Sequence, residues 1–118
     1  MYKRQNIASI LGQRVGLNLA SYATSKSALI QLTKSMALEL ARSNIRVNAL
    51  APGYILTEIN DDFFATEEGQ NYIKKIPMNR LGLEEDLDGA LLLLSSDASS
   101  FMTGSVINID GGHLINPL

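Results

Sequence analysis

Apolar and polar positions along the chain follow two periods, that of a β-strand and that of an α-helix. Short apolar runs predict three strands, at residues 6–10, 45–50 and 105–109. Residues 22–41 and 84–94 instead repeat their apolar positions every three to four residues, which predicts two helices. The order strand, helix, strand, helix, strand is typical of one half of an α/β fold with a parallel sheet. Such a half leaves an open sheet edge, which indicates a truncated domain.

The first predicted helix carries one apolar stripe, which we expect to face the sheet. This stripe comprises Ala28, Leu29, Leu32, Met36 and Leu40. Pro52-Gly53 ends the strand that follows this helix. Residues 57–75 are polar and mixed, and they predict two short helices around Ala65-Thr66. Three carboxylates, Glu84 to Asp86, begin the last helix, where negative charge suits the helix dipole.

Composition narrows the class of protein. Apolar residues make up 46% of the 118 residues and charged residues 19%, which indicates a globular chain. The formal charge of −2 gives no electrostatic reason to expect binding to nucleic acid or to a membrane surface. With no Cys and one His, thiolate chemistry is excluded and no metal site is expected. No apolar run approaches a membrane span and no secretory leader is evident, so we expect a cytoplasmic protein.

The first five residues, Met1 to Gln5, resemble the translation of a transposase end sequence used in preparing sequencing libraries. On this interpretation they are a non-native scar, native sequence begins near Asn6, and the true chain is longer. The alternative is a genuine polar N-terminus.

Tyr22 and Lys26 carry the most informative chemistry of the first helix. They lie one turn apart on the same side, so Lys26 should point toward the packed face of the helix. Lysine is rarely buried without a partner, although its stem can pack beside a core tyrosine while its amine reaches water. Ser9 lies thirteen residues before Tyr22 at a predicted strand end, where it could also serve as a simple cap.

Several further motifs stand in a fixed order with these residues. They are Ile45-Arg46-Val47-Asn48, Pro52-Gly53, Thr57, Leu94-Ser95-Ser96-Asp97 and Thr103-Gly104. The whole set resembles the C-terminal half of a short-chain dehydrogenase/reductase, from about Asn6 to Gly112. This sequence pattern is most similar to that of the beta-ketoacyl carrier-protein reductase and sugar dehydrogenase branches. The resemblance implies the C-terminal half of a Rossmann-type, doubly wound parallel sheet, with residues 6–118 forming half of one NAD(P)-binding domain.

The resemblance also implies a catalytic set of Ser9, Tyr22 and Lys26. Tyr22 would be the general acid toward a ketone or the base toward a secondary alcohol, which requires a phenol that ionises more easily than free tyrosine. Lys26 would supply positive charge for this and hydrogen-bond the nicotinamide ribose. Ser9 would donate a hydrogen bond to the substrate oxygen.

Cofactor contacts are implied after the second strand as well. By resemblance, Pro52, Gly53, Ile55 and Thr57 join Tyr22 and Lys26 in binding the nicotinamide end of NAD or NADP, although Pro-Gly alone is also sufficient for a plain turn. Tyr54 and residues 58–76 would form a mobile lid over the substrate. We expect His113, near the chain end, to be a surface residue.

The sequence also departs from the family pattern. It has no Gly-x-x-x-Gly-x-Gly pyrophosphate loop, and the residue that selects NAD or NADP is absent too. By resemblance we therefore expect an oxidoreductase that acts on a small carbonyl or alcohol, such as a 3-oxoacyl carrier protein or a sugar. We expect this fragment of the enzyme to be inactive by itself. The full-length form would be a homotetramer or homodimer. The competing hypothesis is a non-catalytic remnant or an oligomerisation module.

Overall fold

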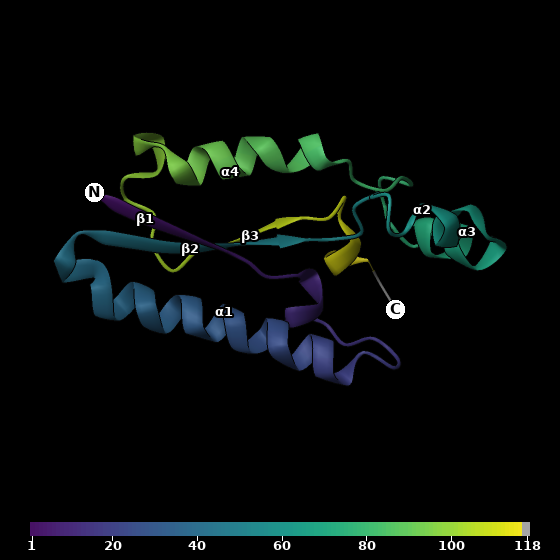
Figure 1. Ribbon diagram of the computed structural model, residues 1–118, viewed down its shortest axis with the longest axis horizontal. Coiled ribbons are helices and arrows are strands. Elements are labelled where there is room, and N and C mark those ends of the chain that lie inside the picture. Colours follow the sequence, from purple (N-terminus) through teal and green to yellow (C-terminus); the bar gives the residue numbers. More distant parts are fainter. Residues whose placement is uncertain (117–118) are drawn as a thin grey trace.

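A three-stranded parallel sheet lies between two helices in the computed structural model, which describes residues 1–116 (Figure 1). The strands are β1 (Tyr2–Ile7), β2 (Ile45–Pro52) and β3 (Val106–Ile109), in the order β1-β2-β3. Helix α1 (Ala20–Leu40) covers one face and α4 (Asp88–Ser95) covers the other. The central strand β2 is buried from Arg46 to Ala51 because it has a helix on each face and a strand on each side. The predicted order of elements and the α/β class are confirmed.

Strand β1 begins at Tyr2 rather than at Asn6. Tyr2 pairs with Ile45 and Gln5 pairs with Asn48, so part of the predicted scar takes part in the sheet. Parallel pairing uses backbone groups, which any residue supplies, and the polar side chains of this stretch find partners of their own. Gln5 Nε2, for example, donates to the carbonyl of Leu94 over 3.1 Å. The boundary of native sequence at residue 6 stays a prediction.

The packed face of α1 differs from the predicted stripe. Its buried residues are Ile30, Thr33 and Ala37, whereas Leu32 is half exposed. Thr33 is buried because its hydroxyl is satisfied on both sides: it donates to the carbonyl of Leu29 (2.8 Å) and accepts from Asn6 Nδ2 (3.0 Å). Leu29 of the predicted stripe does pack against the core beside Ile30, so the packed face overlaps that stripe in part and is centred on Ile30, Thr33 and Ala37.

Two short helices follow β2, as the sequence predicts. They are α2 (Asp61–Ala65) and α3 (Glu67–Ile73), which Figure 1 places beyond the carboxyl end of β2. Thr66 separates them and caps α3, because its hydroxyl accepts from the N–H of Gly69 over 3.1 Å. No helix within residues 1–116 combines the length and the apolar character needed to cross a membrane.

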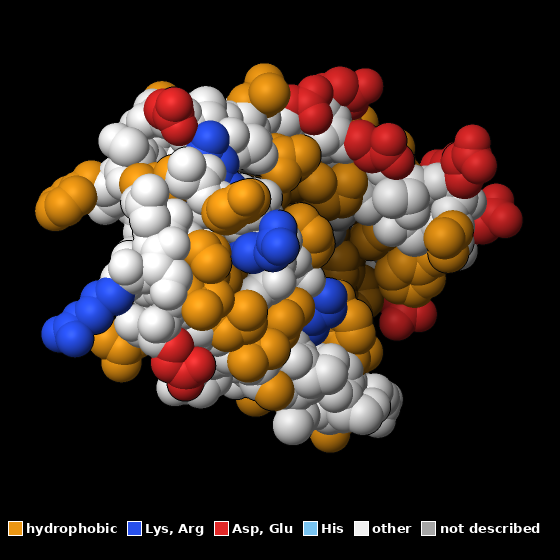
Figure 2. Space-filling view, turned by 60° about the vertical axis from the view of Figure 1, so that its left-hand side comes forward, with side chains coloured by type: hydrophobic (Ala, Val, Ile, Leu, Met, Phe, Trp, Pro, Cys, Tyr) orange, Lys and Arg blue, Asp and Glu red, His pale blue; other side chains and the backbone are white. Residues whose placement is uncertain are grey.

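Apolar surface is exposed beside the sheet. Hydrophobic side chains gather across the middle of the face shown in Figure 2, and most of its acidic side chains lie toward the upper and right-hand margins. Exposed large apolar residues of β1, α1 and α4 include Ile7, Leu38 and Leu92. An apolar surface of this kind is typical of a contact region.

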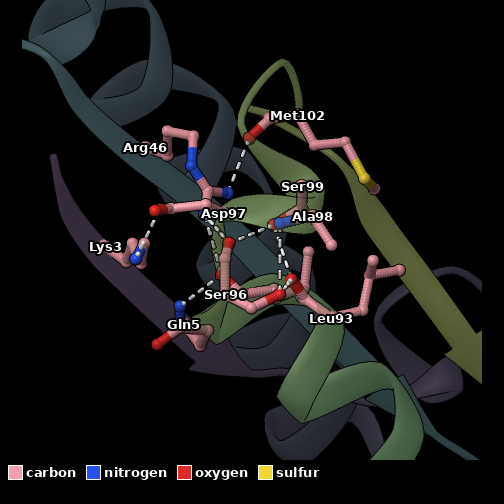
Figure 3. A network of polar contacts seen from close by, with 10 residues as sticks. Lys3, Gln5, Arg46, Leu93, Ser96, Asp97, Ala98, Ser99 and Met102 are labelled. Atoms are coloured by element: carbon pink, nitrogen blue, oxygen red, sulfur yellow. Dashed lines mark hydrogen bonds and ion pairs between the residues drawn. The ribbon is translucent and has the colours of Figure 1, made fainter.

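A polar network ties α4 to the amino-terminal half of the sheet (Figure 3). Arg46 is 4% exposed, and its guanidinium donates to the carbonyls of Leu94, Ser96 and Met102 at 3.0, 3.0 and 3.1 Å. Two of these carbonyls lie at the carboxyl end of α4 or directly after it, where helical carbonyls lack partners of their own. The Arg46 and Leu94-Ser96 motifs of the sequence therefore serve to hold the fold together.

Candidate active site

Ser9, Tyr22 and Gly53 line one cavity of about 250 Å³ at the carboxyl ends of β1 and β2. Each comes from a different segment: Ser9 follows β1, Tyr22 lies in the first turns of α1, and Gly53 follows β2. Tyr54 completes the polar lining. This edge is where open parallel sheets bind ligands, because successive loops converge there. The structure thus brings together three of the residues that the sequence singled out.

Ser9 has an extended backbone (φ −165°, ψ 155°) and is 7% exposed. Its Oγ accepts a hydrogen bond of 3.1 Å from the N–H of Leu11, so the side chain caps the short helix Ile10–Gly12. Within residues 1–116 its hydroxyl proton has no acceptor. The hydrogen bond that Oγ accepts holds the Ser9 side chain in place, and its O–H group remains available to donate to a ligand in the cavity.

Tyr22 and Lys26 lie one turn apart on α1, which begins at Ala20. The Lys26 ammonium lies 5.7 Å from the centroid of the Tyr22 ring and donates 2.9 Å to the carbonyl of Ile7, the last residue of β1. The prediction that Lys26 points toward the packed side is confirmed. Tyr22 is 43% exposed, so its phenol can meet a ligand.

Gly53 connects the carboxyl ends of β2 and β3. Its N–H donates to the carbonyl of Ile109 over 2.9 Å. A Cβ at this position would lie 2.8 Å from Cα of Asp110, so a larger residue would push the two strand ends apart. Pro52 is the last residue of β2 and precedes this close approach.

Ile55 and Thr57 do not line the cavity that contains Tyr22. Ile55 forms a parallel bridge with Gly82 and lines a separate cavity of about 190 Å³. Thr57 is held by Asn60, whose Oδ1 accepts from the Thr57 N–H over 2.8 Å. Their contact with a cofactor stays a prediction.

His113 is not the surface residue that the sequence suggested. Its Nδ1 is buried and its ring lies 5.4 Å from that of Tyr54, between centroids. The chain turns back at Gly111 and Gly112, both with positive φ, and this brings His113 against the site. Burial, together with the positive charge of Arg14, lowers the pKa of the His113 imidazole from its usual 6.5.

Tyr54 lies at the centre of an aromatic cluster. Its ring contacts those of Phe64 at 5.8 Å and Tyr72 at 5.9 Å, both at steep angles typical of edge-to-face packing. Burial raises the pKa of Tyr54 above its usual 10.0. Sequence reasoning did not single out Tyr72 or Arg14 as site residues, because no local pattern indicates that the two segments meet.

The donor set of the first cavity fits the nicotinamide end of a dinucleotide. The phenol of Tyr22 and the hydroxyl of Ser9 line this cavity, and the Lys26 ammonium lies next to Tyr22, where it is held by the Ile7 carbonyl; these groups suit a carbonyl oxygen and ribose hydroxyls. The pyrophosphate end has no such fit in this sequence, because the sequence contains no Gly-x-x-x-Gly-x-Gly.

Comparison with known proteins identifies the class. Residues 5–113 match the family model described as enoyl-(acyl carrier protein) reductase. The chain belongs to the short-chain dehydrogenase/reductase family. It is 41% identical over 110 residues to the 2-dehydro-3-deoxy-D-gluconate 5-dehydrogenase of Dickeya dadantii (strain 3937), covering 92% of this chain and 44% of that protein. It is also 41% identical to a 3-oxoacyl-(acyl-carrier-protein) reductase of Thermotoga maritima, covering 93% and 44%.

Solved structures agree with this assignment. A 4-hydroxyisoleucine dehydrogenase complexed with NADH superposes with a TM-score of 0.92 at 38% identity, covering 98% of this chain and 48% of that one. A gluconate 5-dehydrogenase of Burkholderia cenocepacia J2315, in complex with NADP and tartrate, has a TM-score of 0.89 at 37% identity, covering 94% and 44%. The chain therefore has the Rossmann-like fold of these enzymes and spans less than half the length of the relatives that it matches.

Proposed function

We propose that this chain supplies the catalytic half of an NAD(P)-dependent oxidoreductase that interconverts a ketone and a secondary alcohol. The observation that carries the proposal is the convergence of Ser9 and Tyr22 on one cavity, with Lys26 tethered beside the phenol. The solved relatives with bound NADH or NADP support NAD or NADP as the cofactor. A cytoplasmic, homo-oligomeric enzyme is part of the same proposal.

The chemistry follows from the donors in the cavity. Ser9 donates its free hydroxyl proton to the substrate oxygen and holds the reacting carbon in place. Tyr22 gives its phenolic proton to the same oxygen during reduction, and takes it back during oxidation. Lys26 stabilises the phenolate that results, since its ammonium is fixed by the Ile7 carbonyl. A bound nicotinamide supplies or accepts the hydride.

The contribution of each half can be tested separately. Residues 1–118 hold the acid–base groups and lack the Gly-rich loop, so we expect this chain alone to bind NADPH weakly and to reduce no ketone. A hybrid supplies the other half: the amino-terminal portion of the Dickeya dadantii relative followed by residues 6–118. This hybrid should oxidise NADPH in the presence of small ketones.

Tyr22→Phe in the hybrid removes only the transferable proton. We expect kcat to fall by about a hundredfold or more, while the affinity for NADPH stays unchanged. Ser35→Ala, which removes a hydroxyl elsewhere on α1, is the matched control and should leave kcat unchanged. A hybrid that binds NADPH and keeps most of its kcat after Tyr22→Phe would contradict the proposal, as would tight NADPH binding by residues 1–118 alone.

A further inference from the structure

A second cavity of about 210 Å³ adjoins the one that contains Ser9 and Tyr22. The two cavities share the side chains of Ile10, Leu11, Leu19 and Tyr54 as lining. A ligand that places one atom at Tyr22 can therefore extend past Tyr54 into the second cavity. The groups that line this second cavity should decide what the rest of the substrate can be.

The second cavity contains two cationic side chains, Arg14 and Lys75. Neither has a carboxylate within 4.0 Å in residues 1–116, where the ion pairs are Lys3–Asp97 and Arg80–Asp86. Arg14 Nη1 donates to the carbonyl of His113 over 2.8 Å, which orients the guanidinium and leaves its other N–H groups available. The Lys75 ammonium lies 5.0 Å from the centroid of the Tyr72 ring. Two oriented cations without a paired anion form a site for an anion.

His113 adds a neutral polar group to the same cavity. Its Nδ1 is buried and has no hydrogen-bond partner in residues 1–116. Because that nitrogen is buried, a ligand would meet the rest of the imidazole ring, which lines the cavity beside Tyr54. The nearby acid, Asp110, forms no ion pair with Arg14 within residues 1–116, and its two oxygens accept from the N–H groups of Gly112 and Leu114 at 2.9 and 2.7 Å.

We propose that Arg14 and Lys75 bind the carboxylate of a small hydroxy or oxo acid whose oxidised or reduced carbon reacts at Ser9 and Tyr22. This inference rests on the proposed function and names its substrate class. A carboxylate matches the planar fork of the Arg14 guanidinium, and hydroxyls along the chain match His113 and the tyrosines. Neutral polyols lack the charge that the two cations recognise, and a long acyl chain would meet charged side chains in a cavity of this size.

The binding test compares two probes of matched shape, D-gluconate and the neutral D-glucitol, on the 118-residue chain. Each is titrated while the backbone and arginine Nε signals are followed by NMR. We expect D-gluconate to shift the signals of Arg14 and His113 at concentrations at which D-glucitol does not. Arg14→Gln should weaken D-gluconate binding about tenfold, and Lys75→Gln somewhat less because Lys75 is exposed. Arg42→Gln and Lys74→Gln, exposed and outside both cavities, are the matched controls.

Equal affinity for the two probes would overturn the inference, and so would a D-gluconate preference that survives both Arg14→Gln and Lys75→Gln. The hybrid enzyme provides a second measurement if binding to the short chain is too weak to follow. In the hybrid, Arg14→Gln should raise KM for an acid substrate about tenfold and raise KM for a neutral ketone far less. An equal rise in KM for both substrates, or a fall in kcat on both, would assign Arg14 a structural role and overturn the site.

The two proposals can fail independently. A hybrid that needs Tyr22 but prefers an acyl thioester to every hydroxy acid would overturn the carboxylate site and leave the proposed function standing. If the chain binds D-gluconate through Arg14 but kcat of the hybrid does not change in Tyr22→Phe, the anion site would stand and the proposed function would be contradicted.

Discussion

The two ends of the parallel sheet both hold polar side chains, and they use them in opposite ways. At the amino-terminal end, Arg46 and Asn48 direct their donors to backbone carbonyls, and Asn48 Oδ1 in turn accepts from the N–H of Ser105 over 3.0 Å. At the carboxyl end, Ser9 and Tyr22 face a cavity with hydroxyl protons that have no acceptor in residues 1–116.

This difference separates groups that stabilise the fold from groups that remain available to a ligand. A buried donor that bonds backbone carbonyls stabilises the folded chain, and removing it deletes those hydrogen bonds. A donor that faces a cavity adds little to the stability of the free chain. Substitutions at one end should therefore change the free energy of unfolding, and substitutions at the other should change binding and turnover.

Arg46→Met should give the largest effect on stability. It keeps much of the side-chain bulk and removes the hydrogen bonds to three carbonyls. Each of these carbonyls also accepts from a second side chain, Gln5, Ser99 or Asn48. We expect the free energy of unfolding to fall by about 2–3 kcal/mol. Denaturant titration followed by circular dichroism measures this change in the 118-residue chain.

The control for this prediction is Arg42→Met, an exposed arginine that should change the free energy of unfolding by less than about 0.5 kcal/mol. In the hybrid enzyme, Arg46→Met should leave KM unchanged. Equal destabilisation by both variants, or a changed KM with unchanged stability, would remove the distinction between the two ends of the sheet.

Lys26→Met should have a smaller effect, on cofactor binding. In the hybrid it removes the cation that lies beside Tyr22 and is held by the Ile7 carbonyl, so we expect NADPH binding to weaken by about tenfold. Fluorescence titration of NADPH measures this effect. Lys34→Met, an exposed lysine on the same helix, is the control. If both variants bind NADPH as tightly as the unsubstituted hybrid, Lys26 only packs beside Tyr22.

The order of elements and the placing of Ser9, Tyr22 and Gly53 could be predicted from the sequence. The spacing of apolar residues along the sequence is enough to separate the strands from the helices. The carboxyl ends of parallel strands lie at one edge of the sheet, whatever their side chains are. The position of Lys26 beside Tyr22 followed from the helical spacing, which puts the two residues one turn apart on the same side.

Other features depend on contacts that no local pattern contains. Thr33 lies on the packed face of α1 because Asn6, from another strand, satisfies its hydroxyl. Tyr2 joins β1 because β2 supplies a backbone partner, although its own side chain is exposed. His113 reaches the site only after the turn at Gly111-Gly112, and Arg14 meets it from a segment 99 residues away. Such tertiary contacts override local preference.

The smallest expected effect concerns the pH dependence of stability at the carboxyl end of the sheet. Burial lowers the pKa of His113 below 6.5, so the folded chain holds a neutral imidazole where the unfolded chain already binds a proton. The free energy of unfolding should therefore be highest well above pH 6.5 and should fall as the pH drops through 6.5 toward the lower pKa of the folded chain. His113→Gln removes the titrating group and should flatten the dependence of stability on pH.

Because His113 is the single histidine of the chain, its imidazole signals in an NMR titration give its pKa directly. A value at or above 6.5, or an unchanged slope in His113→Gln, would mean that His113 faces water. Saturating D-gluconate, which would bring negative charge toward the imidazole, should raise the measured pKa if Arg14 and Lys75 hold the carboxylate nearby.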